Sequence, residues 1–338
     1  MRTEPIPAGL AEHARRFYAE GRTAVVPRRA ATVVLLRDAP GGPEVFLVRR
    51  RTTMPFASGM YAFPGGSVDP RDGAEPTGGP WVGPDPESWA RMLGLPGEVR
   101  AAREVVAAAV REMFEETGVL FAGSDADSLV GDVLLTAPPA SADAAPSAGA
   151  LGGDVVAATD SLGADADPPA GAGDTPPAGA GAIPPAGADV TSAAGDVAAE
   201  GWAAARLSLV EHRISLSELL AERRLSVRAD LLHAWARWIT PEFEPRRYDT
   251  FFFLAELPAG QTAREVGGEA DRIAWVRPAD ALAGREAGEL GMLPPTVAVL
   301  ESLSGFDRVA AALAATAPSL APVQPRLEWF EDGARLVL

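Results

Sequence analysis

The chain has 338 residues, of which 47% are hydrophobic, so it is long enough for one large domain or two small ones with a sizeable core. It contains no cysteine, which excludes disulfides, thiolate zinc sites and a cysteine nucleophile. The formal net charge is −16, but 12 acidic residues and no arginine lie within 123–201, and the remainder is only mildly acidic. No basic stripe of the kind that a nucleic-acid duplex requires is present, so nucleic acid is not an expected partner.

The sequence also lacks the apolar runs that membranes require. No run approaches the roughly 18 residues of a membrane span. Residues 1–5 lack the apolar centre of a signal peptide. We therefore expect a soluble cytoplasmic protein with no membrane partner, acting as a monomer or a homodimer.

The first 50 residues predict a short amphipathic helix around 10–18 and then a β-hairpin. Apolar runs at 32–36 and 45–48 flank a Pro-Gly-Gly-Pro turn, which is typical of two paired strands. Arginines 49–51 end the second run. They either form a solvated strand end or place a guanidinium against a substrate phosphate, for which its planar shape is well suited.

Residues 59–66 combine two aromatic residues, a proline and paired glycines. This composition is typical of a strand that ends in a turn where the backbone must approach another group closely. Taken alone the signal is weak. The pattern becomes informative only because an acidic helix follows it in the sequence.

Residues 111–119 predict the end of a helix that carries three carboxylates. Glu112, Glu115 and Glu116 fall within an arc of about 100°, and apolar residues cluster on the opposite side. Gly118 stands where a left-handed C-terminal cap is expected. Acids at this end meet the negative end of the helix dipole, at roughly 0.3–1 kcal/mol each. Charge placed against local stability indicates a divalent-cation site, and oxygen ligands favour Mg²⁺ or Mn²⁺; the alternative is a solvated acidic helix end.

The order Arg-Glu-apolar-x-Glu-Glu-x-Gly-apolar at 111–119 resembles the second half of the Nudix box. The upstream pattern Gly-x-x-x-Phe-Pro-Gly-Gly at 59–66 resembles the approach to that box. The resemblance implies the Nudix fold, an α+β architecture in which a mixed β-sheet lies in an α/β/α sandwich and the box forms a loop-helix-loop. It also implies that the box carboxylates hold Mg²⁺ or Mn²⁺ against a diphosphate.

The resemblance carries over residue by residue to the site. It implies that Arg111 orients Glu115, and that a loop acid such as Glu269 completes the metal site or acts as base, with Glu265 and Asp271 as competitors and a solvated loop as the alternative. Arg246, Arg247 and Asp249, at the start of an expected strand, either reach the substrate pocket or brace one another. The implied metal ligands are Glu112, Glu115, Glu116 and the Gly65 carbonyl, and the implied substrate-binding residues are Arg50, Gly65, Gly66 and Arg247.

The chain departs from the family pattern between the two halves of the box. Gly66 and Arg111 lie 45 residues apart, where the usual spacing is 14, so 31 residues are in excess. The earlier box glutamate would fall on Arg103, and Glu104 is one residue out of register. An interrupted box, together with the runs at 238–241 and 246–253, resembles the nucleoside-diphosphate-linked-moiety-X motif 19 branch, of the coenzyme A diphosphatase type.

Residues 123–201 are low complexity, and the unit Pro-Pro-Ala-Gly-Ala recurs at 168, 176 and 184. Such a segment buries too little apolar surface to offset the entropy of ordering, so we predict a disordered insertion. A folded or partner-binding insertion is the alternative. The expected organisation is one Nudix domain from 28–121 and 202–315, interrupted by the insertion, with terminal extensions at 1–27 and 316–338.

Patterns beyond the insertion predict further helices and strands. His233 lies in one of the expected strands, and we interpret it as a structural residue rather than a base. The expected elements are a helix opened by the capping box at 215–218, paired strands at 232–240 and 248–256, a strand at 273–276, helices from 278 and from 293 to about 315, and an edge hairpin at 327–338.

The resemblance implies a Nudix pyrophosphohydrolase that uses a metal to cleave the pyrophosphate bond of a nucleoside diphosphate linked to another moiety. Coenzyme A or an acyl-CoA is the first substrate candidate, since Arg50 matches an arginine of that pattern, although Pro55 stands where the pattern has another arginine. ADP-ribose, NADH and nucleotide sugars are rivals. Two alternatives of other classes are a non-catalytic Nudix-fold module that senses a nucleotide, and a scaffold built around 123–201.

Overall fold

The structure is a computed structural model that describes residues 3–51, 59–73, 81–130, 201–266, 270–331 and 333–338. Within these residues a seven-stranded sheet has the order β10-β3-β2-β9-β8, with β4 paired to β3 and β5 paired to β2. Strands β2 and β9 run parallel and the other neighbours antiparallel, so the sheet is mixed. Its strands are β2 (Arg28–Ala39), β3 (Gly42–Arg50), β4 (Tyr61–Ala62), β5 (Gly65–Ser67), β8 (His233–Ile239), β9 (Tyr248–Glu256) and β10 (Ala270–Val276).

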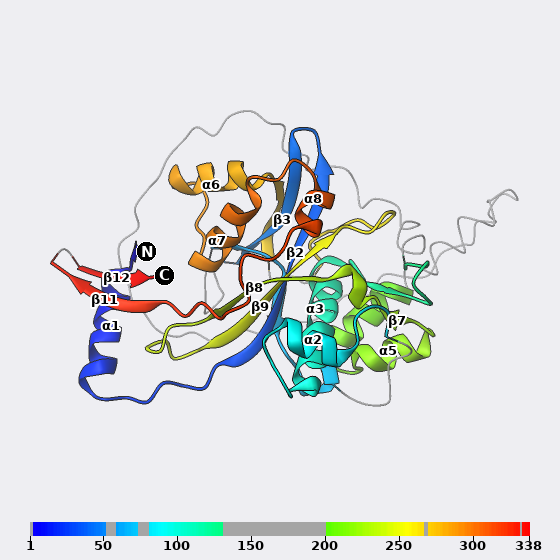
Figure 1. The fold of residues 1–338 in the computed structure, drawn as a ribbon, viewed down its shortest axis with the longest axis horizontal. Helices are drawn as coiled ribbons and strands as arrows, with labels where there is room; N and C mark the ends of the chain where they lie inside the picture. Colours follow the sequence, from blue (N-terminus) through cyan, green and yellow to red (C-terminus); the bar gives the residue numbers. More distant parts are fainter. Residues whose placement is uncertain (1–2, 52–58, 74–80, 131–200, 267–269, 332) are drawn as a thin grey trace, which may run out of the picture.

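Helices cover both faces of this sheet, because its central strands alternate between two apolar cores. Ala31 and Val33 of β2 belong to the core under α3, whereas Val34 belongs to the core under α7 and α8. Figure 1 shows α2 (Pro86–Met92), α3 (Val99–Thr117) and α5 (Leu216–Glu222) on one side of the sheet. It shows α6 (Pro278–Glu286), α7 (Pro294–Leu303) and α8 (Val309–Ala314) on the other.

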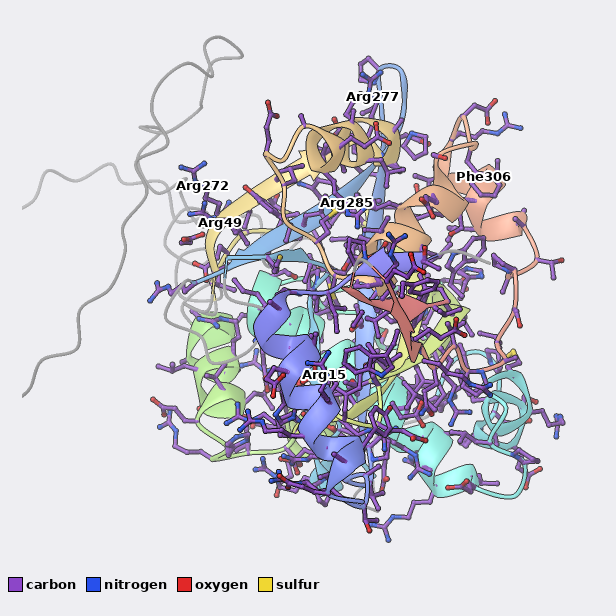
Figure 2. The ribbon with its side chains drawn as sticks, turned by 90° about the vertical axis from the view of Figure 1, so that its left-hand side faces the viewer. Arg15, Arg49, Arg272, Arg277, Arg285 and Phe306 are labelled. Atoms are coloured by element: carbon purple, nitrogen blue, oxygen red, sulfur yellow. The ribbon has the colours of Figure 1, made fainter. Side chains whose placement is uncertain are left out.

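The two ends of the chain pack against each other. Strands β1 (Thr3–Pro5), β12 (Gly333–Val337) and β11 (Arg326–Phe330) form a separate three-stranded sheet beside α1 (Ala8–Ala19). Arg15 of α1, labelled in Figure 2, lies over the ring of Trp329, 4.6 Å from its centroid. Backbone hydrogen bonds between Val323 and β8 join this end to the central sheet.

Short elements complete the described chain. Residues 201–210 are helical, and Trp202 packs edge-on against Phe114 of α3 with ring centroids 5.8 Å apart. No helix among the described residues is long and apolar enough to cross a membrane. The remaining elements are the 3-10 helices η1 (Pro70–Gly73) and η2 (Ala229–Leu231), and the paired strands β6 (Ala122–Gly123) and β7 (Ser226–Val227).

Most expected elements are present, and one differs. The hairpin, the strand pair of β8 and β9, and the capping box at Ser215 are as predicted. The helix expected from 293 to about 315 is two helices instead, because the Val309 amide donates to the Asp38 carboxylate (2.8 Å) and starts α8 afresh beside β2. Most of the predicted disordered insertion, residues 131–200, lies outside the described residues.

Candidate active site

Helix α3 brings three carboxylates to one end of the sheet. The helix ends at Gly118, whose φ of 75° is left-handed. Glycine adopts this conformation without strain, so its position decides where the last turn stops. Glu112, Glu115 and Glu116 therefore lie in the final turns of α3, as the sequence predicts.

Arg111 is the centre of an ion-pair network at this helix end. Its side chain is only 9% exposed. It donates to both oxygens of Asp72 (2.8 and 3.0 Å), to Glu112 Oε1 (2.7 Å), to Glu115 Oε2 (3.2 Å) and to the Ser67 carbonyl (2.9 Å). Burial alone would lower the pKa of Arg111, but the hydrogen bonds to Asp72 and the nearby carboxylate charges raise it overall. Arg111 stays charged and holds the carboxylates in place.

Asp72 is a site residue that the sequence analysis missed. It lies in η1, is buried, and faces Arg111. Counted forward from Gly66, five residues separate the glycine from Asp72, which is the spacing of the first half of the Nudix box with aspartate in place of glutamate. Counting backward from Arg111 led to Arg103 and Glu104 instead. Glu104 pairs with Arg100 (2.9 Å), whereas Asp72 pairs with Arg111. The extra residues of the box therefore follow Asp72.

The paired glycines of β5 allow the carboxylates to come close to the sheet. A Cβ atom on Gly66 would lie 2.6 Å from Glu112 Oε1, and one on Gly65 would collide with the Ala31 carbonyl and lie 2.6 Å from Thr32 Cα. The Gly65 amide donates to Glu116 Oε2 (3.3 Å). The glycine turn and the acidic helix end thus form one site, although they are far apart in sequence.

Burial raises the proton affinity of these carboxylates. It raises the pKa of Glu112 to about 7, against the opposing effect of Arg111. It also raises the pKa of Glu115, again against Arg111. Glu115 Oε1 is buried and has no hydrogen-bond partner among the described residues. This buried oxygen is therefore available as a ligand for a cation.

The donor set suits a hard divalent cation, but its members are not gathered around a single point. Within the described ranges, no three acidic or histidine side chains are close enough to form a ready-made metal centre. Glu112 and Glu115 both turn toward Arg111, while Glu116 turns toward Gly65. The chemistry of the oxygens and the unpartnered Glu115 Oε1 nevertheless fit Mg²⁺ or Mn²⁺.

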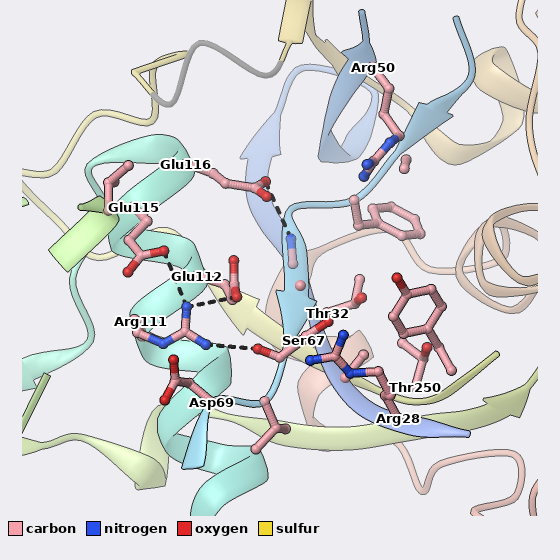
Figure 3. Close-up of a pocket in the computed structure, with 18 of the residues that line it drawn as sticks. Arg28, Thr32, Arg50, Ser67, Asp69, Arg111, Glu112, Glu115, Glu116 and Thr250 are labelled. Atoms are coloured by element: carbon pink, nitrogen blue, oxygen red, sulfur yellow. Dashed lines mark hydrogen bonds and ion pairs between the residues drawn. The ribbon is translucent and has the colours of Figure 1, made fainter. Parts of the chain in front are cut away.

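A cavity of about 600 Å³ lies over this helix end and extends across β5. Figure 3 shows Arg111, Glu112 and Glu115 on one side of β5, and Arg28 and Thr250 on the other. One wall is therefore acidic and the opposite wall basic. Residues of the acidic wall are Asp69, Glu112, Glu115 and Glu116, and polar residues of the basic wall are Arg28, Thr32, Arg50, Arg246, Tyr248 and Thr250.

The expected substrate-binding residues fall in different places. Gly65, Gly66 and Arg50 line the cavity, and Arg50 Nε is buried without a hydrogen-bond partner among the described residues. Arg247 instead donates to the carbonyls of Thr240 (3.0 Å) and Val25 (2.8 Å), so it braces the chain. Its neighbour Arg246 lines the cavity. Glu269, the expected loop acid, lies outside the described residues.

The segment after the insertion adds two residues that no sequence pattern singles out. Arg206 donates to the Glu115 carbonyl (2.9 Å) and so satisfies an acceptor in the last turn of α3. His212 lines the cavity with a left-handed φ of 57°, and its Nδ1 lies 2.6 Å from Arg71 Nη2. Both contacts join residues that are more than 90 positions apart.

A comparison with solved structures finds a Nudix hydrolase with a TM-score above 0.5 and others with lower scores. A Nudix hydrolase from Alicyclobacillus acidocaldarius has 25% sequence identity and a TM-score of 0.55, over 87% of this chain and 99% of the other. The Nudix hydrolase RenU from M. smegmatis has 12% identity and a TM-score of 0.33, over 88% and 94%. The Ap4A hydrolase of C. elegans has 12% identity and a TM-score of 0.31, over 82% and 95%. No protein-family model matches the chain, and no curated protein does.

Proposed function

We propose that this chain, which has the Nudix hydrolase fold, hydrolyses the pyrophosphate bond of a nucleoside diphosphate linked to another moiety. The predicted fold class is confirmed by the mixed sheet between two helical layers and by the A. acidocaldarius neighbour. The observation that carries the proposal is the acidic end of α3 against Gly65 and Gly66 in a cavity with a basic opposite wall. Such a cavity suits a diphosphate, because a cation at the carboxylates and the nearby Arg50 can neutralise it from two sides.

The residues at the end of α3 divide into cation ligands and one residue that orients them. Glu112, Glu115 and Glu116 would hold the cation, with the Gly65 carbonyl as a further oxygen ligand. When bound, Mg²⁺ or Mn²⁺ polarises a phosphoryl oxygen, lowers the pKa of a bound water and neutralises charge on the leaving phosphate. Arg111 orients Glu112 and Glu115 by the hydrogen bonds described above.

Proton transfer and substrate orientation fall to two further residues. Glu112 serves either as a cation ligand or as the base that accepts a proton from the attacking water. Arg50 has a buried nitrogen without a partner in the described part of the chain, at the point where the cavity meets Glu116 and Gly65. We assign Arg50 to the diphosphate, because a guanidinium binds phosphate oxygens in a planar, bidentate manner.

Coenzyme A or an acyl-CoA is the first substrate to test, with ADP-ribose, NADH and a nucleotide sugar beside it. A panel of these diphosphates is incubated with Mg²⁺, with Mn²⁺ and with EDTA, and the products are separated by chromatography. We expect a cation-dependent release of a nucleoside monophosphate from at least one member. Tight binding of a panel member without any cleavage would favour the nucleotide-sensing alternative instead.

Glu116→Gln tests the metal role directly. The substitution keeps the size of the side chain and removes its charge, so we expect turnover to fall by at least about 100-fold, because a bound cation supplies several kcal/mol of transition-state stabilisation. Glu328→Gln removes a charge from an exposed position on β11 and should leave turnover unchanged. Retained turnover with unchanged Mg²⁺ dependence in Glu116→Gln would remove Glu116 from the proposed site.

A further inference from the structure

Two arginines, Arg28 and Arg246, line the basic side of the cavity. In the parallel pairing of β2 and β9, Arg28 lies opposite Tyr248 and Ala30 opposite Thr250. Side chains alternate along a strand, so Arg28, Ala30 and Thr32 share a face. Arg246 lies two residues before Tyr248. Both arginines line the same cavity, together with the hydroxyl-bearing residues of this wall.

Neither of these two guanidinium groups is neutralised within the described residues. Arg28 and Arg246 have no side-chain hydrogen bond or ion pair there, and both are exposed to the cavity. The next arginine along the chain behaves differently: Arg29 pairs with Glu98. Two unpaired guanidiniums in one cavity create a positive potential that attracts an anion and offer planar donors that match phosphate oxygens.

Arg246 and Thr250 come from the β9 side of β2, whereas Gly65, Gly66 and the acidic wall lie on the β5 side. Strands β5 and β9 pair with opposite edges of β2 at Ala30 and Thr32. Neighbouring strands are about 4.8 Å apart, so β5 and β9 are separated by about 10 Å. A diphosphate held at Glu112 and Gly66 would not reach Thr250. Gly65 and Gly66 of β5 have no side chains to fill the space between the two walls. One ligand can therefore contact both walls.

We propose that Arg28 and Arg246 form a subsite for a second anionic group of the substrate, a phosphate monoester on its nucleoside. The inference rests on the proposed function, because it takes the diphosphate to be held at the acidic wall. It narrows the substrate class to nucleoside diphosphate derivatives that carry an additional phosphate. Thr32 and Thr250 line the same wall and supply hydroxyl donors to this group.

Calorimetric binding in EDTA separates this subsite from catalysis. Adenosine 3′,5′-bisphosphate and adenosine 5′-monophosphate are the probes, since they differ by one phosphate monoester. We expect the wild-type protein to bind the bisphosphate about tenfold more tightly, the lower range for a charge-assisted hydrogen bond at an exposed site. In Arg28→Gln/Arg246→Gln the two nucleotides should bind equally, whereas Arg326→Gln, an exposed charge on β11, should keep the preference.

Other outcomes overturn the inference. If wild-type protein shows no preference, or binds neither nucleotide, the subsite does not exist. If the double variant loses affinity for both nucleotides to the same extent, these arginines hold the 5′-phosphate instead. Failure of the proposed function is distinguishable, because it would appear as absent hydrolysis in the substrate panel while the nucleotide preference remains. Coenzyme A and dephospho-coenzyme A are the matched pair for kinetics, since they also differ by one phosphate monoester. We expect the wild-type protein to have a lower KM for coenzyme A.

Discussion

The network around Arg111 depends most on Asp72. Arg111 is buried, and Asp72 accepts two of its hydrogen bonds. Both side chains are nearly inaccessible, at 9% and 2% exposure. A buried charge that loses its partner is costly, because the remaining ion is neither hydrated nor paired.

Asp72→Ala should therefore destabilise the fold by about 3 kcal/mol, the lower end for a broken buried pair, since Glu112 and Glu115 still contact Arg111. Asp72→Asn keeps the side-chain shape and one of the two acceptor oxygens, but it removes the charge, so it should cost somewhat less than Asp72→Ala. Urea unfolding at fixed pH measures the difference. Asp280→Ala breaks an exposed pair with Arg277 and should change stability by less than about 1 kcal/mol. Equal losses in Asp72→Ala and Asp280→Ala would contradict the central role of Asp72.

Individual site residues could be identified from the sequence only where the spacing of the motif determines their positions. Glu112, Glu115, Glu116 and the glycine pair follow from spacing along one helix and one turn, and the structure lines one cavity with them. Asp72 was missed because the extra residues were placed on the wrong side of it. Arg206 could not be identified from the sequence, since its contact with Glu115 depends on how distant segments pack.

At the scale of elements, β5 is the piece that joins sheet and helix. It is three residues long and pairs with Ala30–Thr32 of β2, and its Gly65 amide reaches Glu116. Gly65 has φ of 154°, and any Cβ there would meet backbone atoms of β2 rather than a flexible side chain. Backbone atoms cannot move aside without breaking the ladder.

Gly65→Ala should destabilise the fold by roughly 2 kcal/mol or more, in the range of a strained backbone with an added clash, and should lower turnover by shifting Glu116. Gly118→Ala is the matched control. It also has positive φ, but no atom lies within 4 Å of the added Cβ, so only a conformational cost of about 1 kcal/mol is expected. Chemical unfolding and turnover are measured for both. If Gly65→Ala costs no more than Gly118→Ala, the close approach of β5 to β2 is not what requires glycine.

Regular elements were predictable where periodicity is local. The alternation in β8 and β9 and the capping box of α5 contain their own signal, so they appear as expected. The end of α7 carries a local signal that the prediction overlooked, since Gly305 follows its C-cap Ser304. The start of α8 was not predictable, because it depends on Asp38, a residue of β2 that lies 271 positions before Val309. Pairing of the chain's two ends through β1 and β12 is likewise a long-range contact without a sequence motif.

For the molecule as a whole, the three histidines are its only side chains with ordinary pKa values near neutrality. His233 lies on β8, is half-buried, and is not among the residues that line the cavity. Burial lowers the pKa of His233 below the ordinary 6.5 by disfavouring the imidazolium. The burial of His233 away from the cavity supports its interpretation as a structural residue. Its lowered pKa sets the direction in which the free energy of unfolding changes with pH.

The unfolded chain binds a proton at His233 at higher pH than the folded chain does. Below pH 6.5 the unfolded state therefore carries more protons, so the free energy of unfolding falls as the pH drops and rises again toward neutrality. His233→Asn removes this titration and should flatten the difference in unfolding free energy between about pH 5.5 and about pH 7.5, while turnover at the higher pH stays at the wild-type level. Denaturant titrations at the two pH values give the slope. A slope equal to that of the wild type would show that His233 titrates alike in both states, and a large loss of turnover would return it to the list of candidate bases.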